Sequence, residues 1–159
     1  MNKIQLEIRK AEKGDLKQIN YIAKQVHELH VDLRPDIYVS QEEIISSELL
    51  DALLSEGVVF LGEYNNKIIC YAVCFIRQSN NPILTNRRVI FIDAIAIDED
   101  YQRRGVGKKL MEHIFDFGKT ESCEKVELQV NTVNSNAIEF YKHLKMKEKT
   151  KTFELEVEK

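Results

Sequence analysis

The turn Gln102-Arg103-Arg104-Gly105-Val106-Gly107 is the part of the sequence best suited to chemistry. It follows a nearly unbroken apolar run and precedes a helical pattern, so backbone N–H groups and the positive end of a helix dipole would meet there. Gly105 and Gly107 carry no side chain that would keep an anion away from the backbone. Four basic residues surround them: Arg103, Arg104, Lys108 and Lys109. The turn predicts a phosphate site, although a tight strand-to-helix connection would explain the glycines equally well.

The spacing of this turn excludes two common nucleotide-binding motifs. A nucleoside-triphosphate P-loop requires Gly-x-x-x-x-Gly-Lys-Ser/Thr, but Gly107-Lys108 is followed by Lys109, and Gln102 stands where the first glycine belongs. A dinucleotide-binding turn requires a third glycine, and Leu110 occupies that position. The surrounding elements must therefore decide which phosphate the turn would bind.

Hydrophobic periodicity predicts one α/β domain over residues 1–159, with a mixed, mostly antiparallel central sheet and helices on both faces. The predicted strands cover 4–8, 58–64, 68–76, 89–97, 126–130 and 153–157, with a hairpin at Asn65-Asn66. The run 89–97 is typical of a central strand covered on both faces. The predicted helices cover 16–29, about 40–54, 106–118 and 134–144. Their expected start signals are Asp15, Ser40 with Glu43, and Asn134, and their expected ends are Gly57 and Gly118.

Composition and charge exclude several classes of function. The 26 acidic and 23 basic side chains are mixed along the chain, so we expect no nucleic-acid partner. No apolar run approaches the roughly 18 residues that span a bilayer, so we expect no membrane partner and a cytoplasmic location. Cys70, Cys74 and Cys123 form neither a CxxC pair nor a zinc pattern, and we expect reduced, non-nucleophilic thiols.

Two motifs occur together in the second half of the chain. Ile95-Ala96-Ile97-Asp98 precedes the glycine turn, and Asn134 to Leu144 reads Asn-x-x-Ala-x-x-Phe-Tyr-x-x-Leu. Both resemble motifs of the GNAT family of N-acetyltransferases, in the family's order and spacing, and the element order is similar over nearly the whole chain. The sequence departs from the family at Lys145-Met146, where Gly-Phe is usual, which puts the left-handed turn after the helix in question.

The resemblance implies transfer of an acetyl group from acetyl-coenzyme A to a primary amine of a small molecule or protein, by direct attack on the thioester. It implies that the turn holds the pyrophosphate of the coenzyme and that the strand before it pairs with the pantetheine arm. The cofactor-binding residues implied in this way are Ile95, Ala96, Ile97, Gln102, Arg103, Arg104, Gly105, Val106, Gly107, Lys108, Lys109 and Asn134. Asn134 could also serve as a helix N-cap, and it can have both roles at once.

Two residues are candidates for proton transfer. Tyr141 matches the family's usual general acid, and its phenol could protonate the departing thiolate, whereas periodicity alone would make it a core residue. Asp93, a carboxylate inside an apolar strand, is the main candidate for the base, although pairing with an arginine or an amide would also explain it. Glu63 is a weaker alternative for the base.

The acceptor side is less defined by the sequence. The resemblance places four polar residues where the family's acceptor groove lies, although an ordinary polar helix end and loop would look the same: His27, His30, Arg34 and Tyr38. The two histidines are three residues apart instead of the four of His-Glu-x-x-His, so no metal is expected. The acceptor amine and the oligomeric state stay open, and a homodimer is one of the states allowed.

Two other functions would fit parts of this pattern. A non-catalytic acyl-coenzyme A-binding or sensing domain would need the same turn and strand but no proton transfer. An unrelated nucleotide-binding α/β protein would need only the anion site, and it leaves the helix around Tyr141 unexplained.

Overall fold

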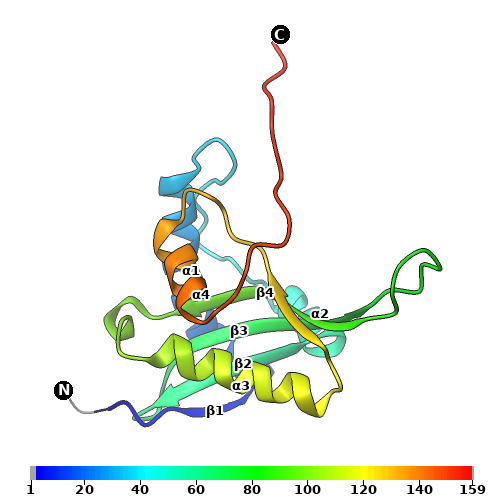
Figure 1. The fold of residues 1–159 in the computed structure, drawn as a ribbon. Helices are drawn as coiled ribbons and strands as arrows, with labels where there is room; N and C mark the ends of the chain where they lie inside the picture. Colours follow the sequence, from blue (N-terminus) through cyan, green and yellow to red (C-terminus); the bar gives the residue numbers. More distant parts are fainter. Residues whose placement is uncertain (1–2, 159) are drawn as a thin grey trace. The chain divides into compact units, whose positions relative to one another are not determined.

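The computed structural model describes residues 3–158, which form two compact units. The first unit ends at Gln129 and contains an open five-stranded sheet in the order β1-β2-β3-β4-β5 (Figure 1). The second unit begins at Val130 and contains one helix and an extended segment. A single domain over residues 1–159 stays a prediction.

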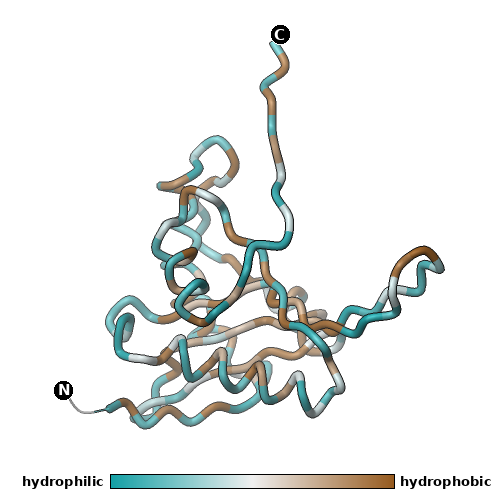
Figure 2. Tube along the Cα trace, in the orientation of Figure 1, coloured by the Kyte–Doolittle hydropathy of each residue, from teal (hydrophilic) through white to brown (hydrophobic). Residues whose placement is uncertain are grey.

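The sheet is mixed, as predicted. Its strands are β1 (Glu7–Lys10), β2 (Val58–Tyr64), β3 (Lys67–Gln78), β4 (Arg88–Ile97) and β5 (Lys125–Leu128). The first four are antiparallel neighbours, and β5 runs parallel to β4. Asn65 and Asn66 form the predicted hairpin turn with φ values of 50° and 61°, a left-handed conformation that asparagine tolerates. Figure 2 shows that apolar residues concentrate in these strands.

Helices cover both faces of this sheet, which confirms the predicted fold class. They are α1 (Leu16–Leu33), α2 (Ser47–Glu56) and α3 (Val106–Thr120). Leu61 of β2 belongs to a buried cluster with Ile19 of α1 and Leu50 of α2. Phe60 points to the opposite face, because side chains alternate along a strand, and its ring contacts His113 of α3 at a centroid distance of 4.8 Å. No helix within residues 3–158 has both the length and the apolar character needed to cross a bilayer.

The predicted start of the second helix is wrong. The helix begins after Ser46, whose hydroxyl oxygen accepts a hydrogen bond from the Leu49 amide at 3.1 Å. The segment around Ser40 instead belongs to a loop whose backbone is held by Asn20 of α1. The Asn20 side chain accepts from the Ile45 amide at 2.9 Å and donates to the Ile45 carbonyl at 2.7 Å. A contact with a distant side chain therefore replaces the local capping box. Gly57 ends α2, as predicted.

The predicted end of α3 is also wrong, because the helix continues past Gly118 to Thr120. Gly118 is buried, and a Cβ atom added there would lie 3.1 Å from Cδ1 of Ile90 in β4. The glycine thus allows close packing of helix and sheet and does not end the helix. The first strand starts at Glu7, later than predicted, although Ile4 before it is buried with 1% exposure.

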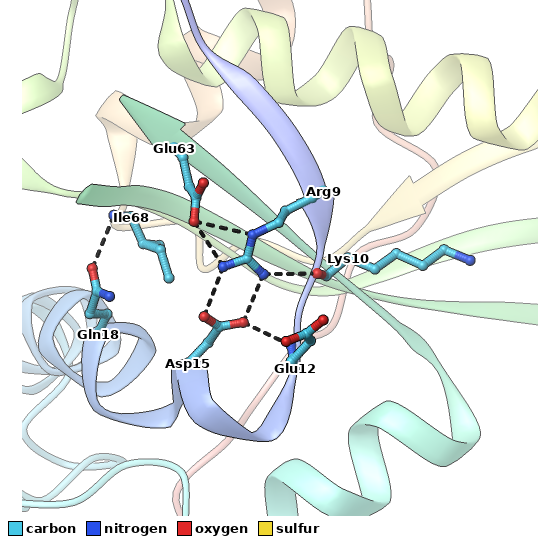
Figure 3. Close-up of polar contacts among 7 residues, drawn as sticks. All are labelled: Arg9, Lys10, Glu12, Asp15, Gln18, Glu63 and Ile68. Carbon is cyan, nitrogen blue, oxygen red and sulfur yellow. Dashed lines mark hydrogen bonds and ion pairs between the residues drawn. The ribbon is translucent and has the colours of Figure 1, made fainter. Parts of the chain in front are cut away.

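A polar network joins the start of α1 to the sheet (Figure 3). Arg9 of β1 donates two hydrogen bonds of 2.8 Å to Asp15 and one of 2.8 Å to Glu63 of β2. Asp15 stands at the N-cap of α1, as predicted, but its carboxylate accepts from the Glu12 amide at 2.8 Å and not from α1. The Arg9 guanidinium holds the pKa of Asp15 below its ordinary value. Glu63, the weaker candidate for the base, is held in this ion-paired network.

The second unit contains helix α4 (Ser135–His143). Its N-cap is Asn134, as predicted, whose side chain accepts from the Ala137 amide at 3.2 Å. After the helix, Lys145 adopts φ 66° and donates its amide to the Lys142 carbonyl at 2.9 Å, while the Met146 amide donates to the Tyr141 carbonyl at 3.1 Å. This is a Schellman-type helix end, so the left-handed turn forms with lysine where the family usually has glycine.

The prediction of a last strand over 153–157 is wrong. These residues adopt no strand, and the side chains of Phe153, Leu155 and Val157 are exposed. Figure 1 shows the segment after α4 as an extended chain, drawn in red. Alternating apolar residues form a strand only where a neighbouring strand takes up their backbone groups.

Candidate functional site

Strands β4 and β5 part at the middle of β4. β5 pairs with β4 only from Val89 to Ile92, whereas β3 pairs with β4 as far as Ile97. The stretch of β4 from Asp93 to Ile97 therefore has an edge with which no other strand in residues 3–158 pairs. Backbone N–H and C=O groups on such an edge can bind an extended, amide-containing ligand in the way that a sheet takes up an added strand.

Asp93 lies where the two strands part. Cys74 of β3 pairs with Ile92 and Val73 pairs with Ala94, so Asp93 is a bulge residue with no partner on β3. Its side chain is exposed, so the predictions of a buried carboxylate and of a strand covered on both faces throughout are wrong at this position. The bulge is the physical reason, because it interrupts the alternation of buried residues along β4. Burial, and next the charge of Asp93, raise the pKa of Tyr71 to about 12.

The turn between β4 and α3 has the geometry of an anion site. Gly105, the N-cap residue of α3, has φ 80°, a left-handed conformation that glycine adopts without strain. The Lys109 amide bonds to the Gly105 carbonyl at 3.2 Å, so the amides that precede it in the helix have no partner within the helix. Gly105 also supplies no capping side chain for them. These amides and the helix dipole, about half a positive charge, can bind an anion.

The first residues of the turn connect it to β4 and to an aromatic ring. Gln102 donates its side-chain amide to the Ile97 carbonyl at 3.2 Å, which ties the turn to the end of β4. Arg103 adopts φ 58° and is exposed. The exposed Arg104 guanidinium lies 5.4 Å from the centre of the Tyr101 ring. Both arginines are therefore available at the surface of the turn.

The two lysines that follow differ from each other. Lys108 is exposed, and its ammonium lies 3.9 Å from the Glu112 carboxylate on the next turn of α3. Lys109 instead donates its ammonium to the backbone carbonyl of Ile4. Its head group therefore takes part in the packing between α3 and the chain before β1, and a role of Lys109 in cofactor binding stays a prediction.

Asp98 anchors the turn, a role that the sequence analysis did not assign. Its carboxylate is fully buried, at 0% exposure, and accepts from Lys67 at 2.9 Å, from the Asp100 amide at 3.2 Å and from Gln25 at 3.4 Å. Burial alone would raise the pKa of Asp98, but these hydrogen bonds outweigh it and lower that pKa below its ordinary value. The bond to Asp100 caps a short 3-10 helix, η2 (Glu99–Tyr101), that leads into the turn.

Lys67 extends this anchor to two aromatic rings. Its ammonium lies 5.2 Å from the centre of the Tyr101 ring and 5.5 Å from that of Tyr21. The hydrogen bond to Asp98 raises the pKa of Lys67. An aspartate directly after an apolar run is a recognisable helix-cap signal, but its lysine partner is 31 residues away in the sequence.

The predicted acceptor-binding residues lie at the end of α1 and in the loop after it, and three of them form a cluster. The Tyr38 ring lies 5.3 Å from the His30 ring and 6.1 Å from the His27 ring, measured between centroids. Nε2 of His27 lies 2.7 Å from the Val39 carbonyl oxygen. Burial, and next the charge of His27, lower the pKa of His30, so it tends to be neutral.

Arg34, the fourth predicted acceptor residue, forms two hydrogen bonds with Asp36, at 2.8 Å and 2.6 Å, within the loop. In residues 3–158, no three side chains among His, Cys, Asp and Glu gather as metal ligands would. All three cysteines are free, and burial raises the pKa of Cys70 and of Cys74 to about 12. These two thiols are poor nucleophiles because the thiolate is the reactive form.

Helix α4 of the second unit carries the remaining predicted site residues, whereas the β4 edge and the turn share the first unit. Asn134 is the N-cap of α4, and its contact with the cofactor, which capping permits, stays a prediction. The Tyr141 ring lies next to that of Phe140, at a centroid distance of 5.3 Å. Burial raises the pKa of Tyr141, so the phenol keeps its proton at neutral pH, as a general acid must.

Proteins named as N-acetyltransferases are among the relatives of this chain. An uncharacterised N-acetyltransferase of Methanocaldococcus jannaschii is 34% identical over 94 residues, which are 59% of this chain but only 41% of that protein. A ribosomal protein bS18 alanine N-acetyltransferase of Escherichia coli strain K12 is 26% identical over 121 residues, 76% of this chain and 73% of that one.

A crystal structure of a mutant protein from Bacillus halodurans has a TM-score of 0.91 and 29% identity, covering 95% of this chain and 99% of that one. The sequence pattern of the Acetyltransferase (GNAT) family matches residues 23–146, which include β4, the glycine turn and α4. This chain therefore belongs to the GNAT family of acetyltransferases.

Proposed function

We propose that this protein is an acetyl-coenzyme A-dependent N-acetyltransferase that acetylates a primary amine of a small molecule or protein. The observation that carries the proposal is that an open strand edge is followed, on one continuous segment, by a helix N-terminus. The edge ends at Ile97, and the helix begins at Val106. A pantetheine arm is an extended chain with amide groups and ends in a pyrophosphate, so its two chemical parts match the two parts of the segment in order.

The segment would hold the donor in two ways. The backbone of Ile95 to Ile97 would pair with the pantetheine amides, and the free amides at the start of α3 would bind the pyrophosphate. Arg103, Arg104 and Lys108 are exposed around these amides and would add charge-assisted contacts. Lys109 is left out of this set because its ammonium bonds to Ile4.

Acetyl transfer then requires a neutral amine, a place for the developing oxyanion and a proton for the leaving group. The amine nitrogen forms a bond to the thioester carbonyl carbon, and a backbone N–H of the β4 edge would donate to the carbonyl oxygen. The carbon–sulfur bond then breaks. Tyr141 would donate its phenol proton to the departing sulfur, which leaves coenzyme A as a free thiol. The attacking nitrogen would lose its second proton as the amide forms, and that proton would return to the Tyr141 phenolate directly or through water.

Asp93 is proposed as the group that takes the proton from the incoming amine. Aliphatic amines are mostly protonated at neutral pH, so this proton must leave before attack. The carboxylate of Asp93 is exposed beside the open edge of β4, and can accept the proton directly or through water. The cluster of His27, His30 and Tyr38 is proposed to contact the acceptor, whose identity beyond a primary amine stays open.

Thiol release tests this proposal against its rivals. The protein would be incubated with acetyl-coenzyme A and a panel of small amines, amino acids and peptides with free amino termini, and free thiol would be measured together with cofactor affinity. We expect thiol release with at least one acceptor. Tight cofactor binding without release for any acceptor would favour the acyl-coenzyme A-binding domain. Displacement of coenzyme A by ATP at similar affinity would favour the nucleotide-binding protein.

Two variants assign the parts of the site. Gly107→Trp is expected to abolish coenzyme A binding, because a large side chain would occupy the space above the free amides. Tyr141→Phe is expected to lower turnover with little change in that binding, since it removes only the transferable proton. If turnover in Tyr141→Phe is unchanged, Tyr141 is not the general acid, and the proposal for coenzyme A binding is unaffected.

A further inference from the structure

Tyr71 of β3 is a buried side chain that the proposed mechanism does not use. It is only 4% exposed and belongs to one buried cluster with Ile22 and Ala23 of α1. Its hydroxyl nevertheless forms no hydrogen bond with a protein group in residues 3–158. In this part of the chain every fully buried side-chain oxygen has a partner, so the Tyr71 hydroxyl oxygen reaches solvent. A phenylalanine would pack in this apolar strand equally well, and the hydroxyl therefore has a role other than packing.

The bulge in β4 places Asp93 on the face of the sheet that Tyr71 occupies. Before the bulge, Ile90 lies against Gly118 of α3, so Ile90 and the residue two positions later face α3. After the bulge, Ala94 packs against the cluster that contains Tyr71 and therefore faces α1. Alternation from the residue before Asp93 gives Asp93 the α1 face as well, and the bulge then lets the next residue keep that face.

Small side chains on β4 leave room between Tyr71 and the open edge of this strand. Tyr71 pairs with Ala96, and Ala94 is its diagonal neighbour on the same face. Diagonal neighbours of this kind lie within reach of an aromatic side chain. Burial, and next the charge of Asp93, raise the pKa of Tyr71 to about 12, so the phenol and the carboxylate interact although no hydrogen bond joins them. Two polar groups at such a separation are commonly bridged by water.

We propose that Tyr71 is a positioning residue for proton removal, because its hydroxyl and the Asp93 carboxylate together hold the water that carries the proton away from the acceptor amine. The phenol O–H donates to one lone pair of this water oxygen. The second lone pair takes a proton from the ammonium nitrogen, while one of the water's own protons passes to Asp93. The phenol keeps its proton throughout, so a tyrosine that stays neutral at pH 7 is suited to this role.

The role of Tyr71 rests on the proposed function, because it requires an amine acceptor and Asp93 as the base. Tyr71→Phe removes the hydroxyl and keeps the ring in the core. With the acceptor amine identified by thiol release, kcat is expected to fall about tenfold, as loss of one hydrogen bond in the transition state gives. The KM for acetyl-coenzyme A should stay unchanged, because the glycine turn is not altered.

The basicity of the acceptor separates proton removal from a structural role. A fluorinated analogue of the same amine has a less basic nitrogen that is largely neutral at the assay pH, so it has no such proton to lose. We expect Tyr71→Phe to acetylate this analogue within about twofold of the parent rate. The rates with the two amines are compared in one protein sample, so a partly unfolded variant does not change their ratio.

Two further variants serve as controls for Tyr71→Phe. Tyr64→Phe removes a phenol hydroxyl from the end of β2, where the ring lies 6.1 Å from that of Tyr101, and it should keep the parent kcat. The double variant Tyr71→Phe with Asp93→Asn should be no slower than Asp93→Asn alone, because both residues act on the same proton.

The outcomes distinguish failure of this role from failure of the proposed function. Equal loss with both amines, or a parent kcat in Tyr71→Phe when Asp93→Asn is slow, would overturn the role of Tyr71 and leave the proposed function intact. A double variant in which the two losses multiply would also overturn it. If Asp93→Asn keeps the parent kcat, Asp93 is not the base and the role of Tyr71 fails with it. Absence of thiol release with every acceptor would overturn both proposals.

Discussion

Two aspartates of the same segment, Asp93 and Asp98, differ in almost every physical respect. Asp93 stands inside β4, surrounded by apolar neighbours in the sequence, yet its side chain is exposed. Asp98 stands just after β4, in a polar stretch, yet it is fully buried at 0% exposure. The sequence around each residue would suggest the opposite. The side chain's environment is decided by strand pairing and by distant partners, and the apolar character of its neighbours does not determine it.

The exposure of Asp93 and the burial of Asp98 suit the two residues to different roles. The bulge leaves Asp93 in contact with solvent beside the open edge of β4, where we propose it as the base. Asp98 is held ionised by Lys67, the Asp100 amide and Gln25, so it is unsuited to proton transfer. It instead fixes the start of the glycine turn. One aspartate therefore belongs to the proposed chemistry, and the other holds the turn that we propose as the phosphate site.

The largest expected effect follows removal of the buried carboxylate. Asp98→Ala leaves three donors without their acceptor and is expected to lower the free energy of unfolding by about 3 kcal/mol. Because the turn loses its anchor, coenzyme A should bind about tenfold more weakly. Chemical unfolding and calorimetric titration would measure the two effects.

Asp100→Ala is the matched control for this change. It removes a nearby exposed carboxylate, while the backbone amide that bonds to Asp98 stays in place. We expect stability and coenzyme A affinity close to those of the parent protein. Equal effects of the two variants would mean that loss of negative charge near the turn, and not loss of the anchor, explains the result.

Loss of the exposed Asp93 carboxylate is expected to lower turnover alone. Asp93→Asn keeps the size of the side chain but removes the base, so kcat should fall by about 100-fold. Coenzyme A affinity and stability should change little, because the side chain is exposed. Steady-state kinetics with a reactive acceptor would measure kcat and KM separately. An unchanged kcat would assign proton removal to water or to another group.

Local patterns in the sequence predict much of the fold and the place of the glycine turn between β4 and α3. Alternation and helical spacing identify the sheet strands, and the two glycines identify the turn, because these features depend on neighbouring residues. The errors occur where distant residues decide. Asn20 holds the loop that resembled a helix start at Ser40, and Ile90 explains Gly118. The partner of Asp98 lies 31 residues away, so no local pattern could identify that anchor.

Acid should reveal the buried aspartate through stability. The pKa of Asp98 is lower in the folded protein than its ordinary value of 3.8. The stability it contributes is therefore present above pH 3.8 and is lost as the pH falls through the lower, folded value. The stability difference between the parent protein and Asp98→Asn should shrink in that range, as followed by unfolding at a series of pH values. Asp15 shifts in the same direction, but it is present in both proteins and cancels in the difference. A difference that does not change with pH would mean that Asp98 is not held ionised.

The smallest effect is expected from loss of Lys67, the ion-pair partner of Asp98. Lys67→Met removes the ammonium, but the lysine side chain is 42% exposed and Asp98 keeps its bonds to the Asp100 amide and Gln25. Partly exposed ion pairs contribute about 0–1 kcal/mol, so the KM for acetyl-coenzyme A should rise by no more than about fivefold, with kcat unchanged. Lys67→Arg keeps the charge and should restore part of this loss. If Lys67→Met weakens coenzyme A binding as much as Asp98→Ala does, the ion pair with Lys67 holds the turn, and the bonds of Asp98 to the Asp100 amide and Gln25 do not. The positioning role would then belong to Lys67 as much as to Asp98.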